Sequence, residues 1–136
     1  MGSVKVVVDT NVLVSALLFG GIPAQLIPLW QRGKIKPLAS KEIIDEYLRV
    51  FTYPRFKLTE EDVNFLLYHE ILPHFEVIDV ESGPRIIKRD PEDDKFIRCA
   101  LAGKAKFIIS GDHHLLASKT YQKIKILSPA DFLREI

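Results

Sequence analysis

The chain of 136 residues has the length of one ordinary domain, and 47% of its residues are hydrophobic, enough to build a core without disulfides. Its 19 basic and 18 acidic residues leave a net charge of +1, so bulk charge neither favours nor excludes a nucleic-acid partner, and the single cysteine excludes an internal disulfide. No apolar run approaches the roughly 20 residues of a membrane span, and Asp9 interrupts the N-terminal run Val4–Val8 too early for a signal peptide. We therefore expect a single domain over residues 1–136 of a cytoplasmic protein that has no membrane contact.

Apolar patterning and punctuation by glycine, proline and capping residues predict strands that alternate with helices. The first strand, Val4–Val8, is short and β-branched, as is typical of a central parallel strand buried on both faces. The expected elements that follow are helices Val12–Phe19 and Pro23–Gln31, strand Ile35–Ala39, helices Lys41–Phe51 and Thr59–Leu72, strand Phe75–Val80, a helix from Asp90-Pro91 to Ala102, strands Phe107–Ser110 and Ile124–Leu127, and a last helix after Ser128-Pro129. This alternation predicts an α/β fold in which helices cover both faces of a parallel sheet.

Four acidic residues that are far apart in the sequence are the candidate functional residues: Asp9, Glu46, Asp93 and Asp112. Asp9 and Asp112 directly follow predicted strands, and in parallel sheets ligands bind beyond the carboxyl ends of the strands. Carboxylates gathered at one edge repel each other unless a cation neutralises them. The pattern therefore indicates a bound divalent metal ion and, with it, phosphoryl chemistry.

Each of these residues also has a purely structural interpretation. Asp9 and Asp112 could cap the segments that follow them, and Glu46 could be a solvated charge beside the apolar stripe of its helix. Helical phase puts Asp93 on the inward face of its helix, although it could serve only as a capping partner. Asp94 is rotated to the side and remains the alternative ligand.

Four short motifs occur in the order and spacing of a known family: Val8-Asp9-Thr10-Asn11, the helical glutamate in Ile43–Leu48, Asp90-Pro91-Glu92-Asp93-Asp94, and Ser110-Gly111-Asp112. Over about Val4 to Leu133 the chain resembles the PIN domain family, especially its small prokaryotic VapC-like toxin branch. The resemblance implies a three-layer α/β/α sandwich with a central parallel sheet. It also implies an endoribonuclease that cleaves single-stranded RNA by means of water activated by Mg²⁺ or Mn²⁺.

The resemblance further implies roles for individual residues. Asp9, Glu46, Asp93 and Asp112 match the family's catalytic metal ligands, while Asn11 and Ser110 match supporting polar positions. A VapBC-type toxin would have an antitoxin protein as partner, and a homodimer is common in the family. Many members carry another aspartate two residues after the one that matches Asp112, and here His114 stands there, which leaves open whether one metal ion or two are bound.

Two other functions fit parts of the pattern. A PIN-like module that binds RNA or protein without cutting it would keep the fold, and a haloacid-dehalogenase-like phosphatase would use Asp9 as nucleophile. The phosphatase needs a second aspartate two residues on, where this chain has Asn11. Nine basic residues in three groups are candidates for RNA binding: Arg32, Lys34 and Lys36; Arg85, Lys88 and Arg89; and Lys119, Lys123 and Lys125.

Overall fold

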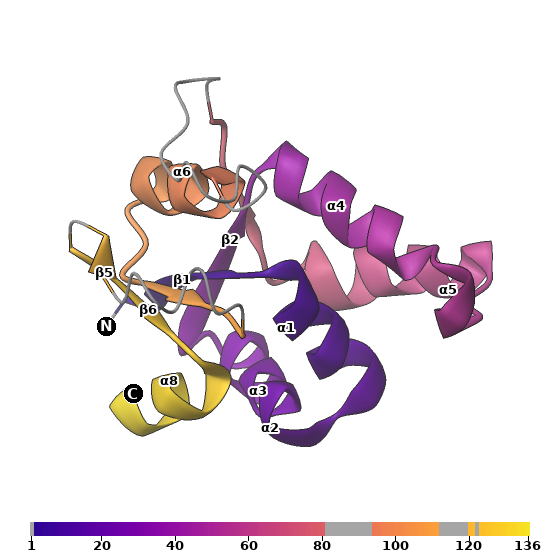
Figure 1. The fold of residues 1–136 in the computed structure, drawn as a ribbon, viewed down its shortest axis with the longest axis horizontal. Coiled ribbons are helices and arrows are strands. Elements are labelled where there is room, and N and C mark those ends of the chain that lie inside the picture. Colours follow the sequence, from indigo (N-terminus) through magenta and orange to yellow (C-terminus); the bar gives the residue numbers. More distant parts are fainter. Residues whose placement is uncertain (1, 81–93, 112–119, 122) are drawn as a thin grey trace.

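A computed structural model describes residues 2–80, 94–111, 120–121 and 123–136, and its centre is a twisted sheet in the order β3-β2-β1-β4-β6-β5 (Figure 1). Five strands are parallel to one another, and β5 pairs antiparallel with β6 at one edge. The strands are β1 Val4–Val8, β2 Ile35–Ala39, β3 Glu76–Val77, β4 Phe107–Ile109, β5 Thr120–Tyr121 and β6 Ile124–Leu127. The predicted α/β fold with a parallel sheet is confirmed.

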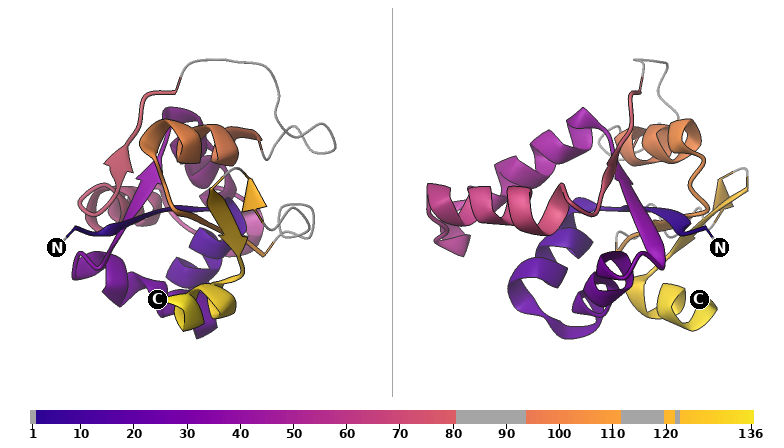
Figure 2. Two further views of the ribbon diagram at one scale, coloured as in Figure 1. Left: turned by 90° about the vertical axis from the view of Figure 1, so that its left-hand side faces the viewer. Right: turned by 180° about the vertical axis from the view of Figure 1, so that it is seen from behind.

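Helices cover both faces of this sheet, which gives three layers (Figures 1 and 2). One face carries α6, with α4 packed beside it, and the other carries α1, α3 and α8. The helical segments are α1 Thr10–Val14, η1 Ser15–Phe19, α2 Gly21–Ala24, α3 Leu26–Gln31, α4 Lys41–Phe51, η2 Pro54–Phe56, α5 Glu60–Phe65, η3 Leu66–Ile71, α6 Asp94–Gly103 and α8 Pro129–Glu135.

The core lies on both sides of β1. Val6, Val7 and Val8 are completely buried, as expected for a central strand between two helical layers. Trp30 of α3 and Tyr47 of α4 pack edge-on against the same ring, that of Phe75. The β1 strand is therefore a rigid base from which the residues after Val8 project.

Side chains cap the starts of two helices that the sequence predicts. The Ser40 hydroxyl accepts a hydrogen bond of 3.2 Å from the Ile43 amide at the start of α4. Thr59 and Asp62 form a reciprocal capping box at the start of α5, with bonds of 2.9 and 3.0 Å. These local signals fix the helix starts independently of the tertiary packing.

Several element boundaries differ from the prediction, each for a local reason. The first helix begins at Thr10 because Asp9 caps it, and the predicted helix from Pro23 to Gln31 divides at Gln25. Pro28 has no amide hydrogen to donate to the carbonyl of Ala24, four residues earlier. The helix is therefore interrupted at Gln25, directly after that carbonyl. The predicted strand Phe75–Val80 shortens to two residues because the Phe75 amide bonds back to Ile71. The start of the predicted helix at Asp90-Pro91 lies outside the described residues. Within them, α6 begins at Asp94.

The strand order reverses between β1 and β4. From β1 the chain first adds β2 and β3 on one side, and then returns to place β4 and β6 on the other. In open parallel sheets such a reversal marks the crevice where ligands bind. Among the described residues no single helix has the length and apolar character to cross a membrane, although the bent pair Thr10–Phe19 and Gly21–Gln31 passes that test jointly with an angle of 87°.

Candidate active site

Asp9 stands at the point where the strand order reverses. Its side chain is 4% exposed, and one carboxylate oxygen accepts a 2.9 Å hydrogen bond from the amide of Val12, which caps α1. The other oxygen accepts a hydrogen bond from the hydroxyl of Ser110, the residue that follows β4. The capping interpretation of Asp9 is thus correct, and it holds the carboxylate in one orientation beyond the ends of two neighbouring strands.

Glu46 is brought to the same place from the middle of α4. Its carboxylate accepts a hydrogen bond from the Thr10 hydroxyl and forms a 2.9 Å ion pair with the ammonium of Lys95 in α6. Arg49, one turn further along α4, approaches it to 3.5 Å. Side-chain exposure is 15% for Glu46 and 4% for Lys95, so this ion pair lies largely away from water. Four elements therefore meet in one polar network: β4 through Ser110, the β1–α1 junction, α4 and α6.

Tyr47 stabilises the junction between β1 and α1 from inside the core. Its ring is completely buried, and its hydroxyl donates a 2.5 Å hydrogen bond to the carbonyl of Val8, the last residue of β1. Burial, followed by the nearby Cys99, Asp9 and Glu46, raises the pKa of Tyr47 well above its ordinary value. The hydroxyl therefore keeps its proton and remains a hydrogen-bond donor at every pH at which the protein would work.

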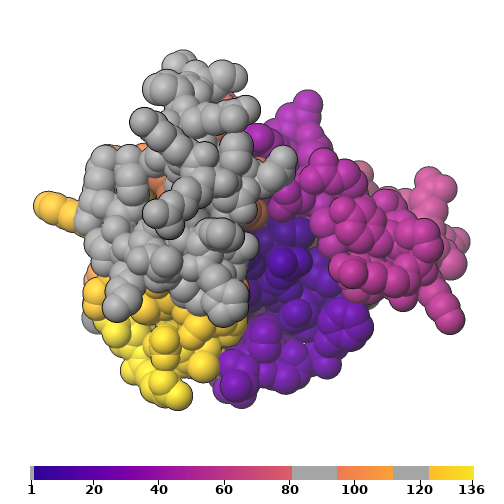
Figure 3. Space-filling view, in the orientation of Figure 1, coloured from indigo at the N-terminus to yellow at the C-terminus, as the bar shows by residue number. Residues whose placement is uncertain are grey.

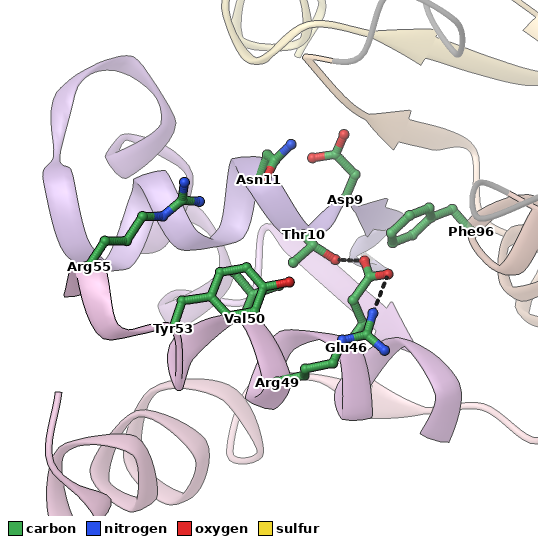
Figure 4. Close-up of a pocket in the computed structure, with 9 residues that line it drawn as sticks. All are labelled: Asp9, Thr10, Asn11, Glu46, Arg49, Val50, Tyr53, Arg55 and Phe96. Atoms are coloured by element: carbon green, nitrogen blue, oxygen red, sulfur yellow. Dashed lines mark hydrogen bonds and ion pairs between the residues drawn. The ribbon is translucent and has the colours of Figure 1, made fainter. Parts of the chain in front are cut away.

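A cavity of about 220 Å³ opens over this network (Figure 4). The side chains of Asp9 and Asn11 point toward one another on one wall, and Glu46 with Arg49 forms the opposite wall. The described residues that line it are Asp9, Thr10, Asn11, Glu46, Arg49, Val50, Tyr53, Arg55 and Phe96. The pocket has carboxylate oxygens at its base, which can bind a cation, and two arginines on its wall, which can bind negative charge. Such a pocket suits a polyanion whose reacting group binds to that cation.

A family model for the PIN domain matches residues 5–114. This chain belongs to the PIN domain family. An uncharacterized protein of Methanocaldococcus jannaschii is 32% identical over 144 aligned residues, which cover 97% of this chain and 91% of that protein. PIN domains are in general nucleases, so the chain has a nuclease-type fold, and the comparisons do not extend to the VapC-like toxin branch.

Of the predicted PIN site residues, the structure brings together Asp9, Glu46, Asn11 and Ser110. Asp93, Asp112 and His114 lie outside the described residues, and Asp94 is described only as the first residue of α6. Gly111 does not have a positive φ, so its own backbone conformation is open to other residues. Two of the four predicted carboxylates thus share a pocket in the described structure.

Several residues in or beside the pocket were missed by sequence reasoning. Lys95 reads as an ordinary solvated cation near the start of an acidic helix, and only tertiary packing shows that it is buried against Glu46. Thr10 was noted only as part of the motif around Asp9, yet its hydroxyl bonds to Glu46. Arg49 and Arg55 were not weighed, although helical phase could have found Arg49 one turn after Glu46.

The basic residues that the sequence suggested for RNA binding lie away from the pocket, as far as the structure describes them. Arg32 and Lys34 precede β2, at the edge of the sheet opposite Asp9, and Lys36 is within that strand. Lys123 precedes β6 at the same opposite edge, and Lys125 pairs with Glu135 at 2.6 Å. Arg85, Lys88, Arg89 and Lys119 lie outside the described residues. Among the described cations, the arginines of the pocket are better placed than these groups to meet a substrate.

PIN domains in general bind Mg²⁺ or Mn²⁺, and the donor set fits such an ion in its chemistry. Asp9, Glu46 and the Asn11 amide offer hard oxygen ligands in one pocket, which is what these cations prefer. Within the described residues no group of three or more His, Cys, Asp or Glu side chains could hold a metal ion. The set predicted from sequence also includes Asp93 and Asp112, which lie outside that part of the chain.

Proposed function

We propose that this PIN domain is a divalent-metal-dependent endoribonuclease that cleaves single-stranded RNA. The observation that carries the proposal is the anchored, buried carboxylate of Asp9 in one pocket with Glu46. Burying a carboxylate opposes folding unless hydrogen bonds or a cation compensate it. Hydrogen bonds from Val12 and Ser110 hold the Asp9 carboxylate at the edge of the sheet where ligands bind, with the partly exposed Glu46 in the same pocket, which supports a site for a cation and its phosphate ligand.

The residues divide the work as follows in this proposal. Asp9, together with Asp93 and Asp112, would hold the metal ion, with Asn11 and Ser110 in support. When bound, the ion lowers the pKa of water and stabilises charge on the departing oxygen. Hydrolysis adds water across one phosphodiester bond, its oxygen to phosphorus and a proton to the leaving 3′-oxygen, which yields 5′-phosphate and 3′-hydroxyl ends.

Glu46 has a distinct role in this scheme. Its negative charge is already compensated within the protein by the ammonium of Lys95, and Thr10 fixes one of its oxygens. We therefore assign Glu46 to orienting the attacking water, with one ion at the site rather than two. A single strong binding event for Mn²⁺ per protomer in titration calorimetry is the expected result, and two events of similar strength would contradict the assignment.

Cleavage of a 5′-labelled single-stranded RNA tests the reaction itself. Cutting is expected with Mg²⁺ or Mn²⁺, none is expected in EDTA, and the downstream fragment should be a substrate for ligation through its 5′-phosphate. Cutting that persists in EDTA, or products that end in cyclic phosphate, would contradict the mechanism. An Asp112→Asn variant should lose cutting, which tests a predicted ligand outside the described residues.

We also propose that the nuclease acts as the toxin of a VapBC-type pair and forms a homodimer. Support for the toxin role is the small size of the chain and the motif resemblance to that branch. Support for the dimer is the exposed aromatic surface on α5 and η3, where Phe65 and Tyr68 are 52% and 60% exposed. Growth arrest on induced expression, relieved by the protein from a neighbouring gene, is expected for a toxin. Light scattering at the mass of two chains is expected for the dimer, and a monomer would remove it.

A further inference from the structure

A second cavity adjoins the carboxylate pocket and has no evident part in cutting a phosphodiester bond. Its volume is about 410 Å³, and its lining is Asn11, Val14, Ser15, Phe19, Arg55 and Phe56. Asn11 and Arg55 also line the carboxylate pocket, so the two cavities meet at these residues. Figure 3 shows the surface of the α1 region directly beside that of the α4 to α5 segment, which forms the other side of this groove.

The groove carries two aromatic rings: Phe56, which also packs against the core, and Phe19, which lies outside it. Phe19 is 68% exposed, and its ring lies 5.8 Å from that of Phe56 at an angle of 50°. The guanidinium carbon of Arg55 lies 4.8 Å from the centre of the Phe56 ring and 5.7 Å from that of Tyr53. An exposed phenylalanine beside a guanidinium plane is the kind of surface on which nucleobases stack.

Charge in the groove selects the same kind of ligand. Among the described residues, Arg55 is the one ionisable residue that lines the second cavity, whereas the first cavity is lined by Asp9 and Glu46 together with Arg49 and Arg55. A ligand that spans both cavities therefore meets cation-attracting carboxylates at one end and an aromatic, cationic surface at the other. A phosphodiester held at the carboxylates with its base in the second cavity matches that polarity.

The backbone holds this surface in place before any ligand arrives. Pro54 begins the short helix η2, in which the Phe56 and Lys57 amides donate to Tyr53 and Pro54 at 3.0 and 3.1 Å. The segment ends at Lys57 in the left-handed region with φ of 54°. The side of the groove that carries Arg55 and Phe56 is therefore pre-formed, and a pre-formed surface loses little entropy when a ligand binds.

We propose that the second cavity is a nucleobase subsite in which one base next to the scissile phosphate stacks on Phe19 and on the guanidinium of Arg55. The inference rests on the proposed nuclease function for the identity of the ligand. The second cavity would then recognise a base on one side of the cleaved bond, separately from the carboxylates that act on the phosphate.

Binding of single-stranded RNA in which one base at a time is removed tests the subsite. The protein carries Asp9→Asn to keep the RNA intact, and fluorescence anisotropy reports the dissociation constant for each abasic oligonucleotide. One position should weaken binding by about 5- to 100-fold when its base is absent, in keeping with the stacking strength of a single base. Phe19→Ala, added to this background, should weaken the intact RNA by a similar factor and abolish the effect of removing that base.

Two further variants separate stacking from charge and from general surface effects. Arg55→Lys keeps the charge but not the planar guanidinium, so it should reduce the base dependence and leave the salt dependence of binding unchanged. Val77→Ala shortens an exposed apolar side chain on β3, away from both cavities, and should leave the abasic pattern unchanged. If no position shows base dependence that Phe19→Ala removes, the subsite is wrong even if the wild-type protein cleaves RNA. If that pattern appears and the wild-type protein does not cleave, the subsite stands and the proposed nuclease function fails.

Discussion

Removing the buried ammonium of Lys95 should destabilise the metal-free protein and strengthen its binding of divalent cations. Lys95 and Glu46 lie 2.9 Å apart, and both are shielded from water. Lys95→Met keeps the length and apolar body of the side chain but leaves the Glu46 carboxylate without its nearest cation. Thr10 still donates to it, and Arg49 stays near at 3.5 Å, so the loss is partial.

The size of the effect follows from the separation of the charges. Two unit charges 2.9 Å apart attract by about 6 kcal/mol at an effective dielectric constant of about 20. Loss of solvation for both groups offsets part of that attraction, while removal of one partner from a buried pair typically costs about 3–5 kcal/mol. With Thr10 and Arg49 remaining, we expect Lys95→Met to lower the free energy of unfolding by about 3 kcal/mol.

Urea denaturation in EDTA, with Lys95→Met, Glu46→Gln and the double variant, measures the pair directly. The double variant should be more stable than the sum of the two single losses by about 2 kcal/mol. Lys106→Met removes one exposed positive charge, and it should change stability by less than about 0.5 kcal/mol. Added Mn²⁺ should stabilise Lys95→Met more than the wild type, because the pocket then carries one more net negative charge. Additive losses together with an unchanged response to Mn²⁺ would refute the role given to Lys95.

Three other substitutions or conditions test the supporting structure. Tyr47→Phe removes the hydrogen bond to the Val8 carbonyl and should lower the free energy of unfolding by about 1–2 kcal/mol in urea titrations; no loss would mean that Tyr47 does not support the end of β1. Burial raises the pKa of Cys99 from 9.0 to about 12, so the folded state retains a proton that the unfolded state releases. The free energy of unfolding should therefore fall as pH rises from 9.0 to about 12, by at most about 1.4 kcal/mol per pH unit. At neutral pH, a thiol reagent should label Cys99 only after denaturation. Rapid labelling of the native protein would contradict the burial of this thiol. Gly103→Ala would place a methyl group 2.5 Å from a Leu38 methyl carbon and should cost about 1–3 kcal/mol in thermal unfolding. Gly2→Ala meets no described atom within 4 Å and serves as the control.

The sheet and the position of Asp9 were predictable because they depend on local patterns. A β-branched run that ends in an acid places that acid at the carboxyl end of a buried strand, and parallel strands gather such ends at one edge. The starts of α4 and α5 are local in the same way, because the side chains of Ser40 and Thr59 accept hydrogen bonds from amides within four residues. These features need no knowledge of which elements pack together.

The remainder of the site depends on contacts between distant elements. Glu46 lies at the flank of the apolar stripe of α4, where its helical phase fits a solvated charge as well as a functional one, so its contacts with Thr10 and Lys95 could not be read from the sequence. Lys95 has no local signal, because its burial follows from the packing of α6 against α4 and appears only when both helices are in place. The groove at Phe19 and Arg55 likewise joins segments on either side of α3 and β2, so no single stretch of sequence displays it.

Single-turnover cleavage of labelled single-stranded RNA by wild-type protein and by Asp9→Asn, each with and without Mn²⁺, tests the central claim most directly. Asp9→Asn retains the shape of the side chain at the carboxyl end of β1 but removes its charge, and circular dichroism verifies that the variant is folded. The account predicts Mn²⁺-dependent cutting by the wild type and a loss of at least about 100-fold in the variant, comparable to loss of one charged group in a preorganised site. Equal cutting by a folded Asp9→Asn protein, or cutting by the wild type that is indifferent to Mn²⁺, would contradict it.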